Sequence, residues 1–584
     1  MISQPNQTVG IRIGKAKHAA LLLWLTLLVW ALWQSGLGRQ PLINWNGFSL
    51  IGQFLAAMVQ PAHDRAFLAL IANATVTTFA FAVCGTTLSL GIGLVGGIFC
   101  SRIWWESVWP GKTGNSTWLG LRGLLVIPRA IHELIWGLLL LSLLGLDPVV
   151  GVLAIALPFG AITAKVFADI IDETPTLPLK ALINSGIRPS LAFFYGHLPQ
   201  ALPNLMSYGF YRFECSLRAA AVLGIIGAGG LGYQIFLSLQ SLQYEQLWTG
   251  FYALILLNGA VDTWSATLRR KMGFVSRMDL TRASKVRPSR VRPSEVRHEG
   301  QADFNQKSPG KNQSRIDTLY IRMSLGAIAL VIPLCFATLS PDWSRLLSAR
   351  SQFTDLATQF TPAQVLPEFS FSLAPLALQT IAMSVLAITL AGLGGILFSF
   401  PAAQNFFLPG GILRSAGETK QLGIGHLFMV LSRIVLLGAR AIPAPILALV
   451  ILYGMFPGIW PGALALAIHN FGILGRLMAE VNENLPDGPV RALRSLGASS
   501  SGVVFYGILP TNLSRFLAYS LYRWEVCLRE TVIVGLVGAG GLGRLMTEQL
   551  SSFDYSGLAA TLSVFVLLTV FIDSLSGWLR STVR

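Results

Sequence analysis

Long apolar segments of about twenty residues recur along this 584-residue chain. A helix of about 20 apolar residues crosses the roughly 30 Å hydrocarbon core of a bilayer. Charged residues make up only 12% of the chain and hydrophobic residues 53%, whereas a soluble domain carries about 25% charged residues. This composition leaves too little polar surface to cover a soluble globule of this size. We therefore expect an all-α integral membrane protein.

Apolar length predicts about twelve transmembrane helices, six before and six after a polar segment at residues 269–316. That segment is rich in arginine, is broken by proline and contains the tetrapeptide VRPS twice, which is typical of a disordered linker. We call residues 1–268 the first half and 317–584 the second half. The predicted spans are 19–36, 74–100, 121–145, 149–171, 200–222 and 246–268, then 320–339, 373–400, 432–456, 460–481, 511–533 and 557–579.

The charge of the linker predicts its orientation. Thirteen Lys and Arg against four acidic residues lie between positions 269 and 315, and such segments stay on the cytoplasmic side. Even numbers of spans on either side then place both termini in the cytoplasm. The basic surface suits anionic lipid, and since no folded nucleic-acid reader is evident, we expect no nucleic-acid partner. Five scattered cysteines without metal-ligand spacing predict no metal site.

The two halves are copies at a fixed offset of 311 residues. The segment YRFE at 211–214 matches YRWE at 522–525, and GIIGAGGLG from Gly224 matches GLVGAGGLG from Gly535. Each half has an even number of spans, so the copies are parallel and related by a pseudo-twofold axis along the membrane normal. A transport path on that axis is the natural expectation.

Ionisable residues within the fifth span of each half predict an anion path. Glu214 and Arg218 lie four residues apart, as do Glu525 and Arg529, so each pair is expected to neutralise itself on one helix face. Arg218 lies about 26 Å along its helix, toward the outer leaflet. Charged groups in a membrane usually face a water-filled interior. The alternatives are a structural Glu–Arg lock, favoured for the glutamates, and anion binding, favoured for the arginines, which include the shallower Arg212 and Arg523.

Further candidates lie in the third and fourth spans. Arg129 and Arg440 are equivalent, but their neighbours differ, with His132 and Glu133 in the first half only. His469 occurs only in the second half and is a candidate for lining the path, although a lone histidine is more often a packed residue. We therefore expect an asymmetric site.

The GAGGLG segments contain glycines suited to a gate. A dinucleotide fingerprint would need a preceding strand, whereas these follow a membrane helix. The glycines permit either close helix packing or a broken helix with free backbone dipoles, and both alternatives remain open. The residues concerned are Gly227, Gly229, Gly230, Gly538, Gly540 and Gly541.

A glycine-interrupted helical segment lies between the fourth and fifth spans of each half, LKALINSGIRPSLAFFYGHLP and VRALRSLGASSSGVVFYGILP. It is either an ordinary interhelical loop or a projection that seats its aromatic residues in a soluble partner. The segment resembles the ATPase-coupling loop of the permease subunits of binding-protein-dependent ABC importers, which reads EAA, three residues, Gly, nine residues, then I-x-L-P. The matching residues are Ala181, Gly186, Leu198, Pro199, Ala492, Gly497, Leu509 and Pro510.

Both halves depart from that pattern in the same places. Lys180 and Arg491 replace the usual Glu, and Gly196 and Gly507 replace the usual Ile. Within the family, the YR[FW]E and GAGGLG segments look most like phosphonate and phosphite permeases. The resemblance implies one fused chain replacing a permease dimer in a bacterial inner membrane, with a cytoplasmic ATPase dimer and an extracytoplasmic solute-binding protein as partners.

The expected function is therefore import of a small phosphorus oxyanion by alternating access. The chain has no GxxxxGK[ST] segment and no catalytic spacing of Ser, His or paired carboxylates. We expect a transport subunit without an ATPase or cofactor of its own, and no enzyme. Alternative substrates are methionine or a quaternary amine, and the alternative mechanism is a passive anion channel.

Overall fold

The computed structural model describes residues 7–39, 41–109, 112–272, 311–361, 368, 372–407, 422–485 and 487–583. Within these ranges the chain is built from helices, and the β pairing is a single antiparallel bridge between Ile43 and Met455. The bulk of the predicted linker, residues 273–310, lies outside the described residues. The helices on either side of it reach into the predicted linker, because α13 ends at Lys271 and α15 begins at Lys311.

The first half consists of helices α1 to α13, and the second of α15 to α28. The principal helices before the linker are α1 (Gln7–Gln34), α2 (Phe48–Ala57), α3 (Arg65–Cys100), α5 (Lys112–Leu124), α6 (Val126–Ala130), α7 (Glu133–Leu144), α8 (Pro148–Glu173), α11 (Leu198–Leu223), α12 (Gly230–Gln240) and α13 (Tyr244–Lys271). Those after it are α15 (Lys311–Leu339), α16 (Ser344–Ser348), α17 (Arg350–Gln359), α19 (Leu373–Ala402), α21 (Leu422–Ala441), α22 (Ala444–Gly454), α23 (Ile459–Glu483), α26 (Leu509–Val534), α27 (Gly541–Ser551) and α28 (Tyr555–Val583).

Each half is organised around one long pair of packed helices, α3 with α8 and α19 with α23. Small residues allow the close approach: a Cβ atom on Gly93 would lie 2.4 Å from Thr163 Cγ2, and one on Gly395 would lie 3.1 Å from Leu474 Cβ. The start of α3 is fixed by Asp64, whose carboxylate accepts a hydrogen bond from the Phe67 N–H, as expected of an N-cap residue. These pairs form the framework on which the other helices pack.

The third span of each half is sharply bent instead of continuous. The helices meet at 82° between α6 and α7 and at 96° between α21 and α22. The apolar segments expected as spans at 121–145 and 432–456 therefore each form two helices joined at a bend. At the first bend Ile131 is extended and His132 caps α7. At the second, Pro443 occupies the N-cap position of α22 and has no backbone N–H to continue the preceding helix.

Six described helices are long and apolar enough to cross a membrane, or up to nine if each bent pair counts as one span. The remaining candidates are α1, α13 and α26, which bring the total to about twelve. The fifth predicted span of the second half forms helix α26. Its charged residues are Arg515, Arg523, Glu525, Arg529 and Glu530. Such a helix must be shielded from lipid by its neighbours.

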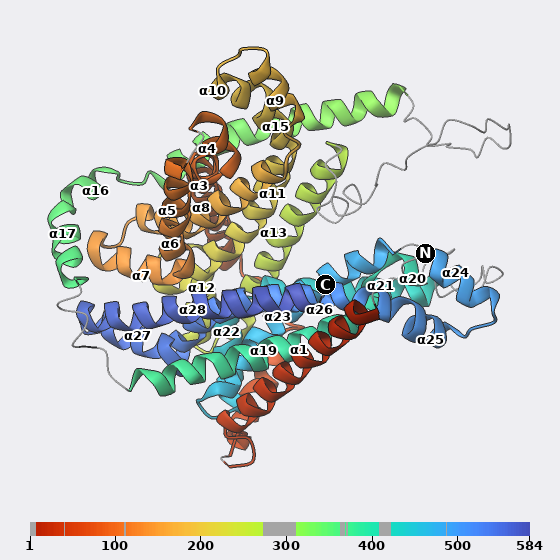
Figure 1. The fold of residues 1–584 in the computed structure, drawn as a ribbon. Helices are drawn as coiled ribbons and strands as arrows, with labels where there is room; N and C mark the ends of the chain where they lie inside the picture. Colours follow the sequence, from red (N-terminus) through yellow and green to blue (C-terminus); the bar gives the residue numbers. More distant parts are fainter. Residues whose placement is uncertain are drawn as a thin grey trace.

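The first helix of each half packs on the other half. In Figure 1, α1 (red) runs alongside α19 and α28 of the second half, and α15 (light green) lies on the side of the first half, where it contacts α3 and α13. Trp24 of α1 meets Trp524 of α26 edge to face, with ring centroids 5.0 Å apart. Cys335 and Leu339 of α15 are buried in the core of the first half. The two halves are thus held together by exchanged helices.

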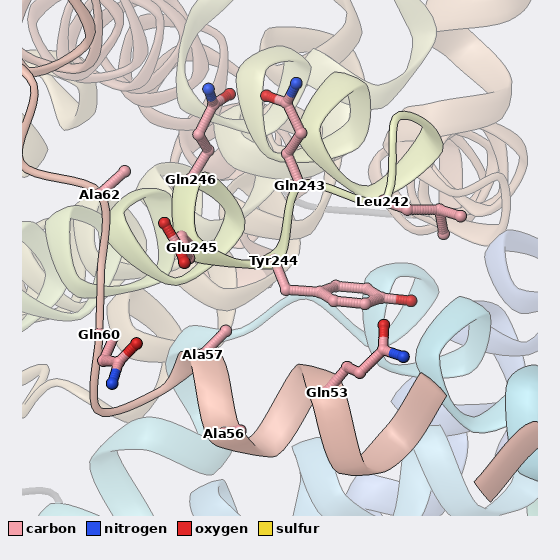
Figure 2. Close-up of a pocket in the computed structure, with 10 residues that line it drawn as sticks. All are labelled: Gln53, Ala56, Ala57, Gln60, Ala62, Leu242, Gln243, Tyr244, Glu245 and Gln246. Atoms are coloured by element: carbon pink, nitrogen blue, oxygen red, sulfur yellow. The ribbon is translucent and has the colours of Figure 1, made fainter. Parts of the chain in front are cut away.

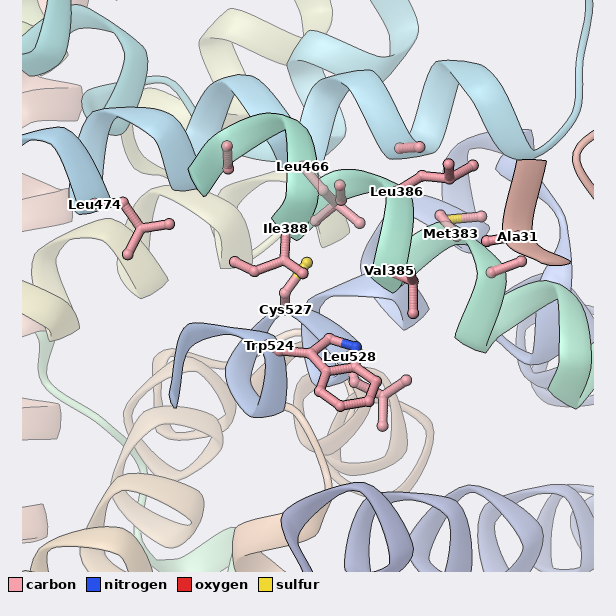
Figure 3. Packing of buried hydrophobic residues seen from close by; sticks show 14 of the residues in the cluster. Ala31, Met383, Val385, Leu386, Ile388, Leu466, Leu474, Trp524, Cys527 and Leu528 are labelled. Carbon is pink, nitrogen blue, oxygen red and sulfur yellow. The ribbon is translucent and has the colours of Figure 1, made fainter. Parts of the chain in front are cut away.

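The core of the second half explains why Trp524 is fully buried (Figure 3). Its ring lies among apolar side chains of α19, α23 and α26, including Val385, Leu466 and Leu528. Its indole Nε1 donates a hydrogen bond to Ser384 Oγ at 3.1 Å, so the polar edge of the ring is satisfied in an apolar setting.

Candidate functional site

Helices α11 and α26 face each other at the pseudo-twofold axis. Val222 and Ile533, which are separated by 311 positions, lie together in one buried cluster with Leu134. Because equivalent residues of two copies can meet only near the axis that relates them, the axis passes between these two helices. The YR[FW]E segments lie about two to three turns earlier on the same two helices.

The predicted Glu–Arg pairs within each helix are replaced by pairs between helices. Glu214 binds Arg269 of α13 at 2.8 Å, and Glu525 binds Arg580 of α28 at 2.7 Å. The expectation that each glutamate neutralises the arginine four residues later was wrong, because the long arginine side chain of the neighbouring helix reaches the carboxylate. These two pairs obey the 311-residue repeat and join neighbouring helices within each half.

The same contact also bears on the depth of the site. Arg269 lies in the last turn of α13, so Glu214 lies level with the end of α13 that leads into the linker. Arg218 lies only about 6 Å further along α11. The structure therefore places Arg218 near the end of α13 that leads into the linker, and the first turns of α11 extend beyond that end.

Arg129 and Arg440 connect the halves. Arg129 Nη2 lies 3.8 Å from Asp573 of α28, and Arg440 binds Asp262 of α13 through an equivalent ion pair. All four side chains are between 18% and 25% exposed. The sequence analysis missed both aspartates, although they are themselves 311 residues apart and a search of the repeat for charged residues would have found them.

The second half contains a polar network that the first half lacks. Arg523 donates to Glu530 and to Asn470 Oδ1, each at 2.8 Å, and Asn470 Nδ2 donates to Glu530 at 2.9 Å. His469 Nδ1 lies 3.2 Å from the Ile442 carbonyl oxygen. Glu530 was missed by the sequence analysis, since it has no acidic equivalent in the first half.

Other predicted residues have clear local roles. The Nδ1 atom of His132 accepts a hydrogen bond from the Leu134 N–H at 3.2 Å and so caps α7. This contact explains the difference from Pro443 at the equivalent position. The predicted asymmetry is therefore present in the bends as well as in the polar network.

Three arginines on the axis helices form no ion pair with a carboxylate in the described part of the chain. Arg212 donates to the Tyr208 hydroxyl, and Arg218 Nη2 lies 3.4 Å from Cys215 Sγ. Arg529 Nη1 donates to the Arg129 carbonyl oxygen at 3.2 Å, across the two halves. Uncompensated guanidinium groups in a low-dielectric setting favour binding of an anion.

The GAGGLG segments break the fifth span and start a new helix. Gly227, Gly229 and Gly230 have φ of 94°, 91° and 76°, and Gly538, Gly540 and Gly541 have φ of 99°, 83° and 72°. These values lie in the left-handed region that favours glycine. The Thr78 hydroxyl of α3 accepts a hydrogen bond from the Leu231 N–H at 2.8 Å, and Thr380 of α19 accepts one from Leu542 at 3.1 Å.

Close packing follows directly after the break. A Cβ atom on Gly232 would lie 1.8 Å from the Ala221 carbonyl oxygen, and one on Gly543 would lie 2.3 Å from that of Val532. The helix is therefore broken and its two parts pack tightly, while the threonine hydroxyls bind the Leu231 and Leu542 N–H groups directly after the break.

We expect Gly230→Ala to destabilise the protein by about 1–3 kcal/mol, because the residue has a positive φ and its Cβ atom would meet Thr78 Oγ1 at 2.5 Å. Thermal unfolding of the detergent-solubilised protein measures the change. The control is Gly91→Ala in α3, where a Cβ atom meets nothing within 4 Å and stability is expected to rise by up to about 1 kcal/mol. Equal transition temperatures for both variants would contradict the packing argument.

The predicted coupling segments project from the bundle as short helices (Figure 1). In the first half they are α9 (Leu177–Asn184) and α10 (Pro189–Ala192), and in the second α24 (Asp487–Ser495) and α25 (Ser500–Gly502). Ala181 lies in α9 and Ala492 in α24, and each pair of helices is joined by a glycine in the left-handed region, Gly186 with φ 85° and Gly497 with φ 79°. Leu198-Pro199 and Leu509-Pro510 begin α11 and α26.

Only part of the predicted aromatic docking surface is accessible. Tyr195 is 80% exposed and Tyr506 is 82% exposed, while Phe505 is 63% exposed. Phe193 is fully buried and packs against Trp104, so the expectation that it docks on a partner was wrong. It begins the π-helical turn Phe193–His197 that leads into α11, and it belongs to the core that holds the projection.

A polar pocket opens at the opposite end of α13 from Arg269. It has a volume of about 530 Å³ and lies between α2 and the start of α13 (Figure 2). Its lining contains no Lys or Arg, which distinguishes it from the arginines at the axis. The polar residues that line it are Gln53, Gln60, Gln243, Tyr244, Glu245 and Gln246.

The family model described as "Binding-protein-dependent transport system inner membrane component" matches residues 107–273 and 422–584. The chain belongs to this family. Two matches in one chain confirm the predicted tandem duplication. Members of the family are permease subunits of multi-pass inner-membrane transporters, in which a separate ATPase hydrolyses ATP and a binding protein supplies the solute.

Three relatives show how far the similarity extends. The "Phosphate-import permease protein PhnE" of Mycolicibacterium smegmatis is 27% identical over 539 residues, covering 92% of this chain and 90% of that protein. The "Phosphite transport system permease protein PtxC" of Stutzerimonas stutzeri is 29% identical, covering 44% of this chain and 88% of that protein. The "Putative cryptic phosphonate transport system permease protein PhnE2" of Escherichia coli is 37% identical, covering 20% and 96%.

The two glycines of this permease that replace the usual isoleucine of the coupling-loop pattern have a packing reason. A Cβ atom on Gly196 would lie 2.4 Å from Leu182 Cδ1, and one on Gly507 would lie 2.8 Å from Leu493 Cδ1. Leucines of the preceding helix thus occupy the space of the isoleucine that the family pattern usually has. Lys180 is exposed on α9, so its side chain disturbs no packing within the fold.

Proposed function

We propose that this chain is the permease of an ATP-driven importer for a small phosphorus oxyanion such as phosphate, phosphite or a phosphonate, with the path between α11 and α26. The observation that carries the proposal is the set of three axis arginines without a carboxylate partner in the described part of the chain, Arg212, Arg218 and Arg529. The names of the three relatives described above point to the same class of substrate.

The charge balance supports an anion over a cation. The carboxylates of α11 and α26 are already engaged by other arginines: Glu214 by Arg269, Glu525 by Arg580 and Glu530 by Arg523. The net charge left at the axis is therefore positive. A guanidinium group binds phosphate-like oxygens through paired N–H donors, whereas a quaternary amine would require a cage of aromatic rings.

The proposal includes the arrangement of the partners. The ATPase dimer docks on the two projections formed by α9–α10 and α24–α25, and both termini and the linker lie on the same, cytoplasmic side. The solute-binding protein docks on the opposite side, where the glutamine-rich pocket opens. Residues 1–268 and 317–584 act as the two permease units, and the Gly227–Gly230 and Gly538–Gly541 breaks form the gate.

The test is ATP-driven uptake of radiolabelled phosphite, phosphate and methylphosphonate into proteoliposomes that contain this chain, its ATPase and its binding protein. We expect Arg218→Gln/Arg529→Gln to lower uptake at least about tenfold, because loss of two charged donors removes more than about 1.4 kcal/mol of anion binding. Arg102→Gln is the control, since its ion pair with Glu106 is exposed.

Each other outcome contradicts a different part of the proposal. Uptake of methionine or a quaternary amine in place of all three oxyanions would overturn the substrate class. Oxyanion flux that needs no ATPase would overturn the importer and favour a passive channel. Normal uptake in the double variant would overturn the path between α11 and α26.

A further inference from the structure

The two equivalent arginines Arg212 and Arg523 lie in opposite electrostatic settings. Arg523 is held by the carboxylate of Glu530 and the amide of Asn470. At the positions 311 residues earlier the first half has Ala219 and Phe159, which offer neither charge nor hydrogen bond to Arg212. Only one of the two equivalent arginines is therefore neutralised by a carboxylate.

Arg212 is buried, with 7% of its surface exposed. Its guanidinium carbon lies 4.8 Å from the ring centroid of Phe159 and 5.3 Å from that of Tyr208, whose hydroxyl accepts a hydrogen bond from Nη2. Its Nε atom is buried and has no hydrogen-bond partner in the described structure. Leaving such a donor unsatisfied costs about 1–3 kcal/mol, so the site lacks an acceptor.

We propose that Arg212 and Tyr208 form a one-sided anion-binding subsite on the transport path, while Arg523 has a structural role. This inference rests on the proposed function and specifies which half holds the phosphorus oxyanion. The N–H groups of Arg212 donate to the oxygens of the anion, and the Tyr208 hydroxyl holds the guanidinium group in place. The aromatic walls exclude water and thereby strengthen these charge-assisted bonds.

The position of the subsite suits a path between the halves. Tyr211 of α11 and Tyr522 of α26 occupy equivalent places in the two halves and are 37% and 46% exposed. Arg212 also lies close to Tyr211, with its guanidinium carbon 6.0 Å from that ring centroid. A change in the separation of α11 and α26 would therefore expose the subsite to the axis.

The decisive variant installs the missing carboxylate. Ala219→Glu places a glutamate seven residues after Arg212, the spacing at which Glu530 binds Arg523 at 2.8 Å, so it should neutralise Arg212. We expect the KM for phosphite uptake to rise at least about tenfold in Ala219→Glu and in Arg212→Gln, the change expected from losing one charge-assisted contact. Tyr208→Phe, which removes only the hydroxyl, should raise KM by a smaller factor.

The matched control acts on the other half. Arg523→Gln/Glu530→Gln removes both charges of the second-half pair and should leave KM within about threefold of the wild-type value, since a neutralised pair contributes little net attraction for the anion. Because Ala219 is only 3% exposed, Arg212→Gln and Tyr208→Phe provide the test if Ala219→Glu fails to yield a monodisperse complex.

The outcomes separate the two proposals. If the wild-type complex takes up none of the oxyanions, the proposed function and this inference both fall. If the wild type takes up phosphite and Arg212→Gln keeps the wild-type KM, this inference alone falls. An equal rise of KM in the second-half control would likewise overturn the one-sided assignment, because both halves would then bind the anion.

Discussion

Uptake in a Tyr195→Glu/Tyr506→Glu variant should fall to the level seen without ATP. These side chains are about four-fifths exposed, at 80% and 82%, and they occupy equivalent places on the two projections. A carboxylate in an apolar docking groove costs several kcal/mol because it loses its hydration without gaining a partner. Both contacts are lost together, so the ATPase should no longer bind.

Two measurements check this result. Affinity purification of the chain should no longer recover the ATPase, and radiolabelled uptake should match the ATP-free background. Substitution of such exposed residues changes folding stability by less than about 0.5 kcal/mol, so the melting temperature should be unchanged. Tyr195→Phe/Tyr506→Phe keeps the rings and should retain both properties. An ATPase that still co-purifies with the glutamate variant would contradict the docking assignment.

The second large effect is expected when the ion pairs between the halves are removed. Asp262→Asn/Asp573→Asn leaves Arg440 and Arg129 without partners at sites only 18–25% exposed. Loss of one partner from a largely buried pair leaves an uncompensated charge, which costs up to about 3 kcal/mol for each pair. The variant should unfold at a lower temperature, and its uptake should fall with the amount of folded protein.

Exchanging the two residues of one ion pair tests whether the stability comes from the opposite charges or from the particular side chains. Arg440→Asp/Asp262→Arg restores opposite charges on α21 and α13 and should recover most of the stability lost in Arg440→Asp alone. Glu106→Gln is the control for an exposed pair, since Arg102 and Glu106 are 61% and 52% exposed, and its effect should stay below about 1 kcal/mol. An unchanged melting temperature in Asp262→Asn/Asp573→Asn would show that these pairs do not hold the halves together.

Much of the architecture could be predicted from the repeat. A fixed offset of 311 residues correctly paired Arg129 with Arg440 and Glu214 with Glu525, and the structure gives the members of each pair equivalent partners. Apolar length predicted where most spans lie because burial in lipid constrains every residue of a span. The length of an apolar segment does not show where the helix axis changes direction. The bends of 82° and 96° could therefore not be predicted from it.

The partners of the charged residues were harder to predict. Spacing within one helix suggested that Glu214 binds Arg218, whereas Arg269 of a neighbouring helix binds it instead. Helical periodicity describes which residues share a face and not which helix packs against that face. Glu530 could not be predicted from the repeat, because the equivalent residue of the first half is Ala219.

The exchange of first helices sets the order in which this protein can assemble during synthesis. Helix α1 ends at residue 34, and its packing partner α19 begins at residue 373. A ribosome that adds about 5–20 residues per second needs roughly 20–70 s to cover that distance. During this time α1 must wait in the bilayer with its contact surface turned to lipid, and its small residues Ala20 and Ala31 offer little surface for unwanted association. Helix α1 therefore docks late, after the helices of the second half that it contacts have been synthesised.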